Sequence, residues 1–463
     1  MDNAWGRSLL LLSRISLCLA STPGPLTFSE KDAQAAVNAV VASRTATSAR
    51  QQALLGSALH TSRLLFAASK KEGLDEAFRS SGVLQQMMVL MPTPPPQGEG
   101  KDAAADGARA AADADSTGGA ALRPDSWRPV EELIYIAGVI KNVSNFVDNQ
   151  QWLVRQGAVA TLVGIVRGAL DASRRPGSGD SLGSGSDGDA SKGGKGGASS
   201  SQRHLAQLMV QVTGTLRNLC LNKRHLKPFW DAGAVDVLLS LLKGYARHAE
   251  LMLNVARILG KLSLSDRCRS RFTRHPPHLQ ALLRLISVHP SHATLLVRVC
   301  FVVGNLTASN DANRRRVAIE FGAAPPLLRA VNYFAKRFAR RDRAGTGDSK
   351  GGDGDDGADD AGGGGGEGKS AEGGRRRGAV GGPRETEEVL VKAVRVLANI
   401  AINAEVGARL AATPGIDVLV SLLEAADVSE HEELVLNLVS AVTNLSFYAR
   451  RGGGGGGGGG AAE

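Results

Sequence analysis

A motif repeated about every 45 residues constrains the fold of this 463-residue chain more than any other feature. Each copy is a run of Val, Leu or Ala that leads to an Asn, and one copy has Lys in place of the Asn. We call this the key position; it falls at Asn142, Asn218, Lys261, Asn305, Asn399 and Asn444, with separations of 76, 43, 44, 94 and 45 residues. Removing Gly-rich inserts of 31 and 43 residues reduces the two long gaps to 45 and 51. A period of this length predicts stacked helical units.

A glycine marks a second fixed point in the repeat. Gly157, Gly233, Gly322 and Gly415 lie 15 to 17 residues after a key position, and each opens a short apolar segment. We expect these glycines to form positive-φ turns that let two helices approach closely. The predicted unit is a short first helix, a glycine turn, a second helix and a longer third helix that ends near the key position. The third helices are apolar over a broad arc, which indicates neighbours on both sides.

This pattern is that of an armadillo repeat, so the sequence predicts an all-α, right-handed superhelix (α-solenoid) with disordered Gly-rich inserts. Weaker copies precede the first clear repeat: Gly82 opens a second helix, Ala67 takes the key position, and Leu9–Ala20 is a third helix rather than a signal peptide. Residues 275–278 (His-Pro-Pro-His) replace the glycine turn of one unit, and we expect a proline-stiffened turn there rather than a zinc site.

The glycines divide the chain, because 40 of the 57 lie in four stretches. Segments of this composition bury too little apolar surface to fold. The predicted organisation is degenerate repeats at 1–93, an insert at 94–126, repeats at 127–171, an insert at 172–202, repeats at 203–340, an insert at 341–384, repeats at 385–450 and a Gly tail at 451–463. The inserts all fall between a second and a third helix, so they leave one edge of the array.

Charge, cysteine content and hydropathy narrow the class of protein. A net charge of +10 permits acidic partners. The four cysteines are far apart and lie in or beside apolar runs, which predicts reduced core thiols in a cytoplasmic protein. No uncharged apolar run reaches the ~18 residues of a membrane span, so no membrane association is expected.

Three motifs match functional patterns only formally. Gly363–Ser370 fits the Walker A pattern and Gly179–Gly183 the nucleophile-elbow pattern, but both lie in Gly-rich inserts without the flanking strand that the chemistry requires. Asp353–Asp360 lacks the Glu and the spacing of an EF-hand loop. The sequence therefore predicts no enzyme, cofactor or metal site.

A partner-binding groove is expected along the third helices, which line the concave face of an armadillo array. Basic residues recur on these helices at and just before the key positions. The candidate groove residues are Lys141, Asn142, Arg217, Asn218, Arg257, Lys261, Arg298, Asn305, Lys392, Arg395, Asn399 and Asn444. Such a groove suits an extended acidic protein segment. Alternatively, the asparagines tie adjacent repeats together and the basic residues are solvated.

Two further observations bear on the partner. Importin-like receptors carry Trp four residues before the Asn, where this chain has Gly138, Gly214, Phe301, Arg395 and Ser440, so basic nuclear signals are not expected ligands. A second basic cluster at 311–343 has nine Arg or Lys against three acids. It is either a solvated helix end or a contact for phosphates or an acidic protein surface such as that of tubulin; nucleic acid is not an expected partner.

Longer strings resemble a specific family, the armadillo repeat-containing protein 2 family of ciliary proteins. They are TGTLRNL (213–219), NVARILGKLS (254–263), VRVCFVVGNLTASN (297–310), VRVLANIAI (394–402) and EELVLNLVSAVTNLSFY (432–448). The resemblance implies a non-enzymatic adaptor in the cilium or flagellum that serves axoneme assembly, with radial-spoke or intraflagellar transport proteins as partners. The alternative is a general cytosolic or nuclear scaffold that binds acidic peptides. Members of the family continue with further repeats after the last string, which predicts that this chain is truncated at its C-terminus.

Overall fold

The structure is a computed structural model that describes residues 59–92 (with gaps at 60, 61, 64, 71, 72 and 81), 130–173, 200–345 and 383–449. These residues form helices and turns with no strand among them, so the predicted all-α class is confirmed. The chain divides into two compact units, Met1–Leu262 and Ser263–Glu463. The predicted third helix at Leu9–Ala20, the insert at 94–126, the Gly tail, most of the other two inserts and the three formal motifs lie outside the described residues.

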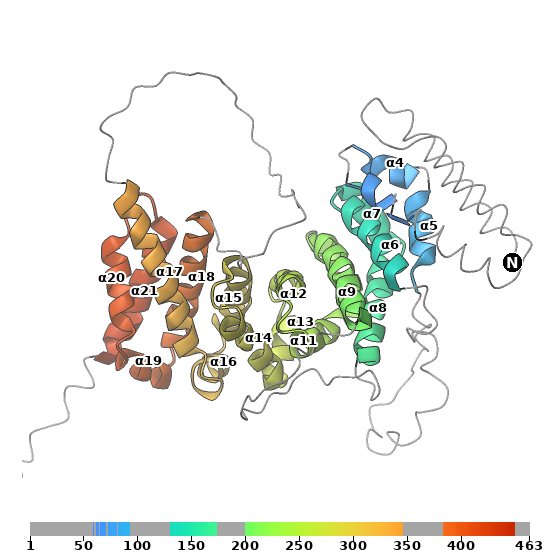
Figure 1. The fold of residues 1–463 in the computed structure, drawn as a ribbon. Helices are drawn as coiled ribbons and strands as arrows, with labels where there is room; N and C mark the ends of the chain where they lie inside the picture. The colour runs from blue at the N-terminus through green and yellow to red at the C-terminus, as the bar shows by residue number, and fades with distance from the viewer. Residues whose placement is uncertain are drawn as a thin grey trace, which may run out of the picture. The chain divides into compact units, whose positions relative to one another are not determined.

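The first unit contains three helix groups in the predicted order of third, first and second helix (Figure 1). A short helical turn at residues 65–68 takes the place of the leading third helix. The other elements are α4 (Asp75–Ser80), α5 (Val83–Leu90), α6 (Val130–Val143), α7 (Val147–Arg155), α8 (Ala158–Ser173), α9 (Ser200–Leu219), η4 (Lys223–His225), α10 (Leu226–Asp231), α11 (Ala234–Gly244) and α12 (Ala249–Leu262). The third helices α6, α9 and α12 pack in succession.

The second unit repeats the same order and ends on a third helix. Its elements are α13 (Asp266–Arg274), α14 (Pro276–Val288), α15 (Ala293–Thr307), α16 (Asp311–Arg315), η5 (Arg316–Glu320), α17 (Ala324–Gly345), α18 (Pro383–Ala401), α19 (Ala404–Ala411), α20 (Ile416–Ala425) and α21 (Glu432–Ala449). The third helices α15, α18 and α21 lie side by side. As predicted, Pro276 stiffens the turn that lacks glycine, because it is the first residue of α14.

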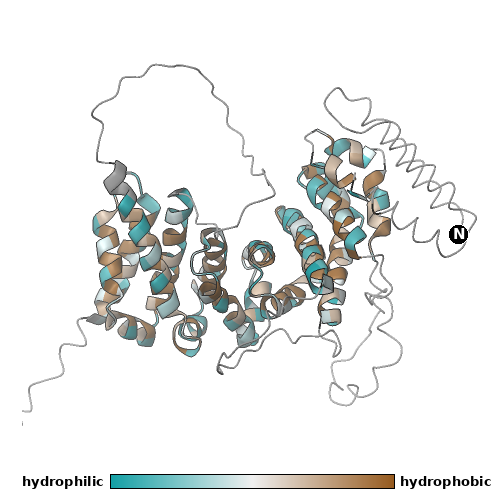
Figure 2. Ribbon diagram, viewed as in Figure 1, coloured by the Kyte–Doolittle hydropathy of each residue, from teal (hydrophilic) through white to brown (hydrophobic). Residues whose placement is uncertain are grey.

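The core of each unit lies between stacked third helices and the first and second helices that cover them. In α12, Leu251, Val255, Ile258 and Leu259 are all fully buried, which agrees with the broad apolar arc read from the sequence. Apolar residues line the contacts between helices in both units (Figure 2). Because α9 packs between α6 and α12, and α18 packs between α15 and α21, no single repeat could bury either helix alone.

Four glycine turns have the expected left-handed backbone and one does not. Gly82, Gly157, Gly233 and Gly322 have φ between 56° and 78° and precede second helices or their first turn. The prediction is wrong for Gly415, whose φ is −67°. A β-carbon at Gly415 would lie 2.7 Å from Leu328 Cδ1, so close packing against α17, and not backbone conformation, explains this glycine.

Short polar side chains begin most of the first helices. Asn222, Ser265, Asn310 and Asn403 each accept a hydrogen bond from a backbone amide two or three residues later. They lie four or five residues after a key position, so the chain turns from the third helix into the next first helix at a fixed distance. This turn brings the C-terminal ends of the third helices to one edge of each unit, where the key residues lie.

Candidate protein-binding surface

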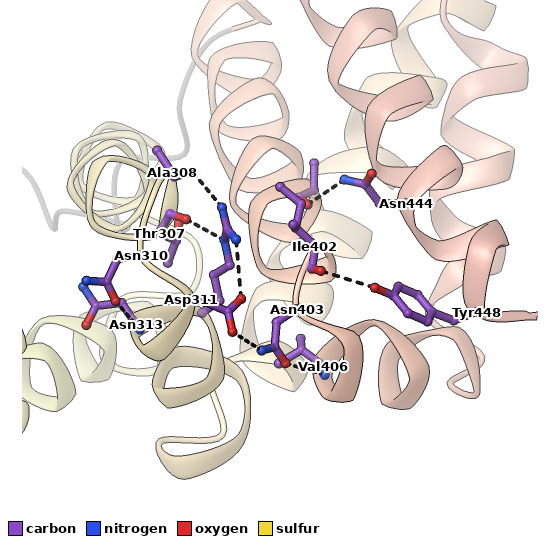
Figure 3. Close-up of polar contacts among 12 residues, drawn as sticks. Thr307, Ala308, Asn310, Asp311, Asn313, Ile402, Asn403, Val406, Asn444 and Tyr448 are labelled. Carbon is purple, nitrogen blue, oxygen red and sulfur yellow. Dashed lines mark hydrogen bonds and ion pairs between the residues drawn. The ribbon is translucent and has the colours of Figure 1, made fainter.

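The key asparagines form hydrogen bonds between successive third helices. In each case the amide nitrogen Nδ2 donates to a hydroxyl or a carbonyl within the same unit, and for all of them except Asn305 this acceptor lies at the end of the preceding third helix. The bonds are Asn142 to Ser69 Oγ (2.9 Å), Asn218 to Ser144 Oγ (2.9 Å), Asn305 to Ser263 Oγ (2.9 Å), Asn399 to the Gly304 carbonyl (3.3 Å) and Asn444 to the Ala398 carbonyl (3.0 Å; Figure 3). The asparagines therefore tie neighbouring repeats together, and their donors are directed into the stack.

In the repeat whose key position is Lys261, Asn254 makes the hydrogen bonds to the preceding third helix. Its Nδ2 donates to the Val210 carbonyl at 3.2 Å and to Thr213 Oγ1 at 3.4 Å, both on α9. It lies seven residues, or two helical turns, before Lys261, so both side chains lie on one face of α12. Asn254 is not among the residues expected from the repeat, and the signal for it in the sequence is an Asn two helical turns before a key position that is not Asn.

Arg217 is held in a fixed orientation by two of these amides. Its guanidinium donates to Asn218 Oδ1 at 3.1 Å and to Asn254 Oδ1 at 3.3 Å. Both amide oxygens accept from Arg217 while their nitrogens donate into the neighbouring repeat.

Four cations follow the edge of the first unit where its third helices end; we call them the cationic row. They are Lys70, Lys141, Arg217 and Lys261. Burial lowers the pKa of Lys141, the positive charges of Arg217 and Lys70 lower it further, and Glu250 opposes them. Burial raises the pKa of Cys220 to about 12, and the charges of Lys261 and Arg217 act against this rise. The four cations are thus close enough to influence one another or a common neighbour.

A glycine on one third helix makes room for Lys141 on the preceding third helix. A β-carbon at Gly214 would lie 2.7 Å from Lys141 Cδ, so the aliphatic stem of the lysine lies directly on the α9 backbone. Gly138 of α6 receives the Phe66 ring in the same way, at 2.5 Å. Both glycines occupy the position where importin-like receptors carry Trp. A tryptophan there would collide with the preceding repeat, so these two repeats are built to exclude it.

The candidate cations of the second unit differ, because acids of the next third helix pair with two of them. Arg298 of α15 lies 4.0 Å from Glu388 of α18, and Lys392 of α18 lies 2.8 Å from Glu433 of α21. Arg395 is exposed on α18. The cations predicted for the groove therefore form two sets: the cationic row in the first unit, and ion pairs between helices in the second. Arg257 belongs to neither set and lies half-buried on α12.

Three arginines of the second basic cluster make contacts inside the fold. Arg314 donates to the carbonyls of Thr307 and Ala308 at 2.9 and 2.7 Å, which satisfies the C-terminal end of α15 (Figure 3). Arg315 pairs with Glu320 and Glu405. Arg316 donates to the Thr273 carbonyl at 3.0 Å. This part of the cluster stabilises the junction of α15, α16 and α19 and is neither simply solvated nor presented to a ligand.

Two properties of the described residues bear on metal binding and on membrane insertion. The rings of His275 and His278 are 5.5 Å apart, and no group of three or more His, Cys, Asp or Glu within the described ranges could hold a metal ion. Of the helices that the structure describes, none alone is long and apolar enough to cross a bilayer. Cys220, Cys268 and Cys300 are buried, as predicted for core thiols, while Cys18 lies outside the described residues.

The structure is an all-α solenoid of the armadillo type. It is defined by groups of three helices, by the glycine turns and by the hydrogen bonds that asparagines make between third helices. Comparison with known proteins confirms the more specific resemblance that the sequence strings indicated. The chain is similar to Armadillo repeat-containing protein 2 of Homo sapiens, at 28% identity over 320 residues, and of Bos taurus, at 25% over 391 residues. These matches cover 69% and 84% of this chain but only 32% and 36% of the relatives, so the chain spans about a third of their length. No family model matches the sequence.

Two solved structures give weaker likenesses. One comes from work on a phosphorylation switch that controls the interaction between cadherin and beta-catenin; it has 13% identity and a TM-score of 0.39, with 95% of this chain and 65% of that chain covered. The other is UNC-45 from Drosophila melanogaster, with 12% identity and a TM-score of 0.24 over 96% and 58% of the two chains.

Proposed function

We propose that this chain is a non-enzymatic adaptor that binds an acidic, extended protein segment along the cationic row of its first unit. The observation that carries this proposal is the environment of Lys141. Its stem is fixed on Gly214, burial disfavours its charge, and its nearest cationic neighbours repel it. Glu250 offsets part of this cost, and a carboxylate from a partner would offset more of it, because it would bring a second opposite charge to Lys141.

The orientation of Arg217 also favours the binding of an acidic segment. Two amide oxygens orient its guanidinium, so little side-chain entropy is lost when a carboxylate reaches it. The successive third helices pack about 8–10 Å apart. An extended segment rises about 3.3 Å per residue and turns every second side chain to the same face, so acidic residues two or four positions apart, about 7 or 13 Å, bracket the spacing of successive cations in the row.

The cellular setting that we propose is the motile cilium or flagellum, including its cytoplasmic assembly stage. There the adaptor would serve axoneme assembly, with radial-spoke precursors or intraflagellar transport proteins as the acidic partners. The similarity to Armadillo repeat-containing protein 2 over most of this chain supports that setting. A general armadillo scaffold that binds acidic peptides would use the same row, so the partners recovered from cells must separate the two functions.

Affinity capture from cells that are regrowing cilia tests the proposal. The tagged chain is compared with a Lys70→Glu, Lys141→Gln, Lys261→Glu variant, and with a control that carries Arg329→Glu, Lys336→Glu and Arg340→Glu at exposed positions of α17. We expect radial-spoke or transport proteins with the native chain and the control, and their loss from the row variant. Recovery of nuclear or adhesion proteins alone would favour the general scaffold. Partners that the row variant retains would show that the row is not the site.

A further inference from the structure

Four exposed residues of α17 recur at intervals of four, three and four positions, so they share one face of the helix. They are Arg329, Tyr333, Lys336 and Arg340, and we call this set the basic face of α17. The guanidinium carbon of Arg337 lies 5.9 Å from the centre of the Tyr333 ring and adds a further cation beside the face. Residues 324–341 contain no Asp or Glu, so the charge that this helix contributes to the face is entirely positive.

The cations of the basic face differ from the rest of the second basic cluster. The arginines at 314–316 contact carbonyls or carboxylates inside the fold. Within the part of the chain that the structure describes, no carboxylate pairs with Arg329, Lys336 or Arg340. Lys336 and Arg340 are one helical turn apart, and like charges at this spacing destabilise a helix. A negatively charged group on the basic face would therefore stabilise α17.

The chain carries acidic residues a short distance beyond this helix in the sequence. Residues 346–382 connect α17 to α18 and lie outside the described residues. Within them, residues 353–360 contain no cation and five aspartates, namely Asp353, Asp355, Asp356, Asp359 and Asp360. We call residues 353–360 the acidic segment. It begins eight residues beyond Gly345, the last residue of α17.

The lengths of the helix and of the connection allow the acidic segment to reach the basic face. At 1.5 Å per residue, Arg340 and Arg329 lie about 8 and 24 Å from the end of α17. Eight residues of extended chain reach about 26 Å, and the seven steps from Asp353 to Asp360 span about 23 Å. The segment can therefore turn back at the end of α17 and follow the basic face. The 22 residues that follow it are long enough to return to α18, which packs against α17.

We propose that the basic face of α17 is the docking site of the chain's own acidic segment. The aspartates pair with Arg329, Lys336 and Arg340, and the hydroxyl of Tyr333 donates to one carboxylate. Each exposed ion pair is weak, but the segment is tethered beside the face, so its effective concentration there is of the order of millimolar. The docked segment covers the basic face, so an acidic protein from outside must displace it. This site lies in the second unit and does not rest on the cationic row.

Zero-length crosslinking of the full chain tests this contact, because a carbodiimide joins a lysine amine to a carboxylate only where the two groups touch. We expect mass spectrometry to find Lys336 joined to aspartates of the acidic segment. Arg329→Gln with Arg340→Gln should lower the yield about fivefold although Lys336 is retained, and about 0.5 M NaCl should lower it similarly. The matched control replaces two exposed arginines of the first unit and should leave the yield unchanged: Arg224→Gln with Arg247→Gln.

Acetylation of Lys336 provides a second measurement. With all five aspartates replaced by Asn, Lys336 should react about threefold faster with acetic anhydride, because carboxylates no longer cover the amine or favour its charged form. Lys243, which is exposed on α11, should react at an unchanged rate. Circular dichroism verifies that each variant remains folded. A crosslinking yield that neither salt nor the arginine variant lowers, or an unchanged acetylation rate at Lys336, would overturn the proposal. So would crosslinks chiefly to lysines of the cationic row, or crosslinks between isotope-labelled and unlabelled copies.

Discussion

Asn218 donates its side-chain amide to the hydroxyl of Ser144 at 2.9 Å, although the two residues are 74 positions apart. The same Nδ2 lies 3.2 Å from the Lys141 carbonyl and 2.9 Å from Asn145 Oδ1, and the Asn218 oxygen accepts from Arg217. One buried amide therefore joins α6 to α9 and also orients a cation of the proposed binding row. We therefore expect stability and the proposed binding to depend on the same side chain at this position.

Replacing Asn218 with Ala should destabilise the protein by about 1–3 kcal/mol, because buried acceptors lose their donor. Asn444→Ala is the matched variant at the key position of α21, where a half-buried amide makes one bond to the Ala398 carbonyl. It should cost about 1 kcal/mol or less. Urea unfolding monitored by circular dichroism measures both, and equal losses would contradict a special role for Asn218.

Gly157 and Gly415 should respond differently to the same substitution. Gly157 has φ 76° with open space around the missing β-carbon, so Gly157→Ala should cost about 1–2 kcal/mol through backbone strain. At Gly415 the backbone is already right-handed and the obstacle is the end of the flexible Leu328 side chain. Gly415→Ala should therefore cost less than about 1 kcal/mol. Thermal unfolding of the two variants compares them; a larger loss at Gly415 would disprove this account of the two glycines.

The repeat, its three-helix order and most glycine turns could be predicted from the sequence, because stacking requires apolar and small residues at a fixed period. The role of the asparagines could not, since a periodic amide is equally suited to a ligand and to a neighbouring repeat. Only the position of Ser144 and its equivalents decides between these roles. Gly415 was misread for a similar reason, because a glycine required by packing and one required by φ look alike in a sequence.

The cationic row was predicted in part. Lys141, Arg217 and Lys261 lie at or beside key positions, so the period identified them. Lys70 was missed because its repeat is degenerate and carries Ala67 at the key position. Conversely, Arg298 and Lys392 also lie at a fixed distance before a key position, but they face Glu388 and Glu433. These ion pairs join residues 90 and 41 positions apart, and no local sequence pattern indicates a pairing over such distances.

Cys220 and Cys300 should resist alkylation in the folded protein. Burial raises the pKa of each thiol to about 12 from an ordinary value of 9.0, so neither forms thiolate at neutral pH. Above about pH 9 the unfolded chain releases these protons and the folded chain retains them, so their contribution favours unfolding as pH rises. Iodoacetamide labelling read by mass spectrometry should modify both residues only after urea unfolds the chain. Rapid labelling under native conditions would contradict their burial.

Lys141→Met should make the protein more stable and bind an acidic partner less tightly. Because the pKa of Lys141 is lowered on folding, the unfolded chain binds this proton more readily in the range just below pH 10.5, and the charged lysine costs stability at neutral pH. Methionine keeps the apolar stem over Gly214 and removes the charge. Its advantage in urea unfolding should be largest near neutral pH and should be lost above pH 10.5, where wild-type Lys141 becomes neutral in both states.

The binding half of this prediction uses a fluorescent peptide of alternating Glu and Ser as the probe. Lys141→Met should weaken its binding about tenfold and reduce the dependence on salt, because one charge contact is lost. Lys261→Met is the control, since this lysine is exposed: it should also weaken binding, yet change stability by less than about 0.5 kcal/mol. A Lys141 variant that is more stable and binds equally well would mean that the lysine is strained for another reason, and that the acidic segment binds elsewhere.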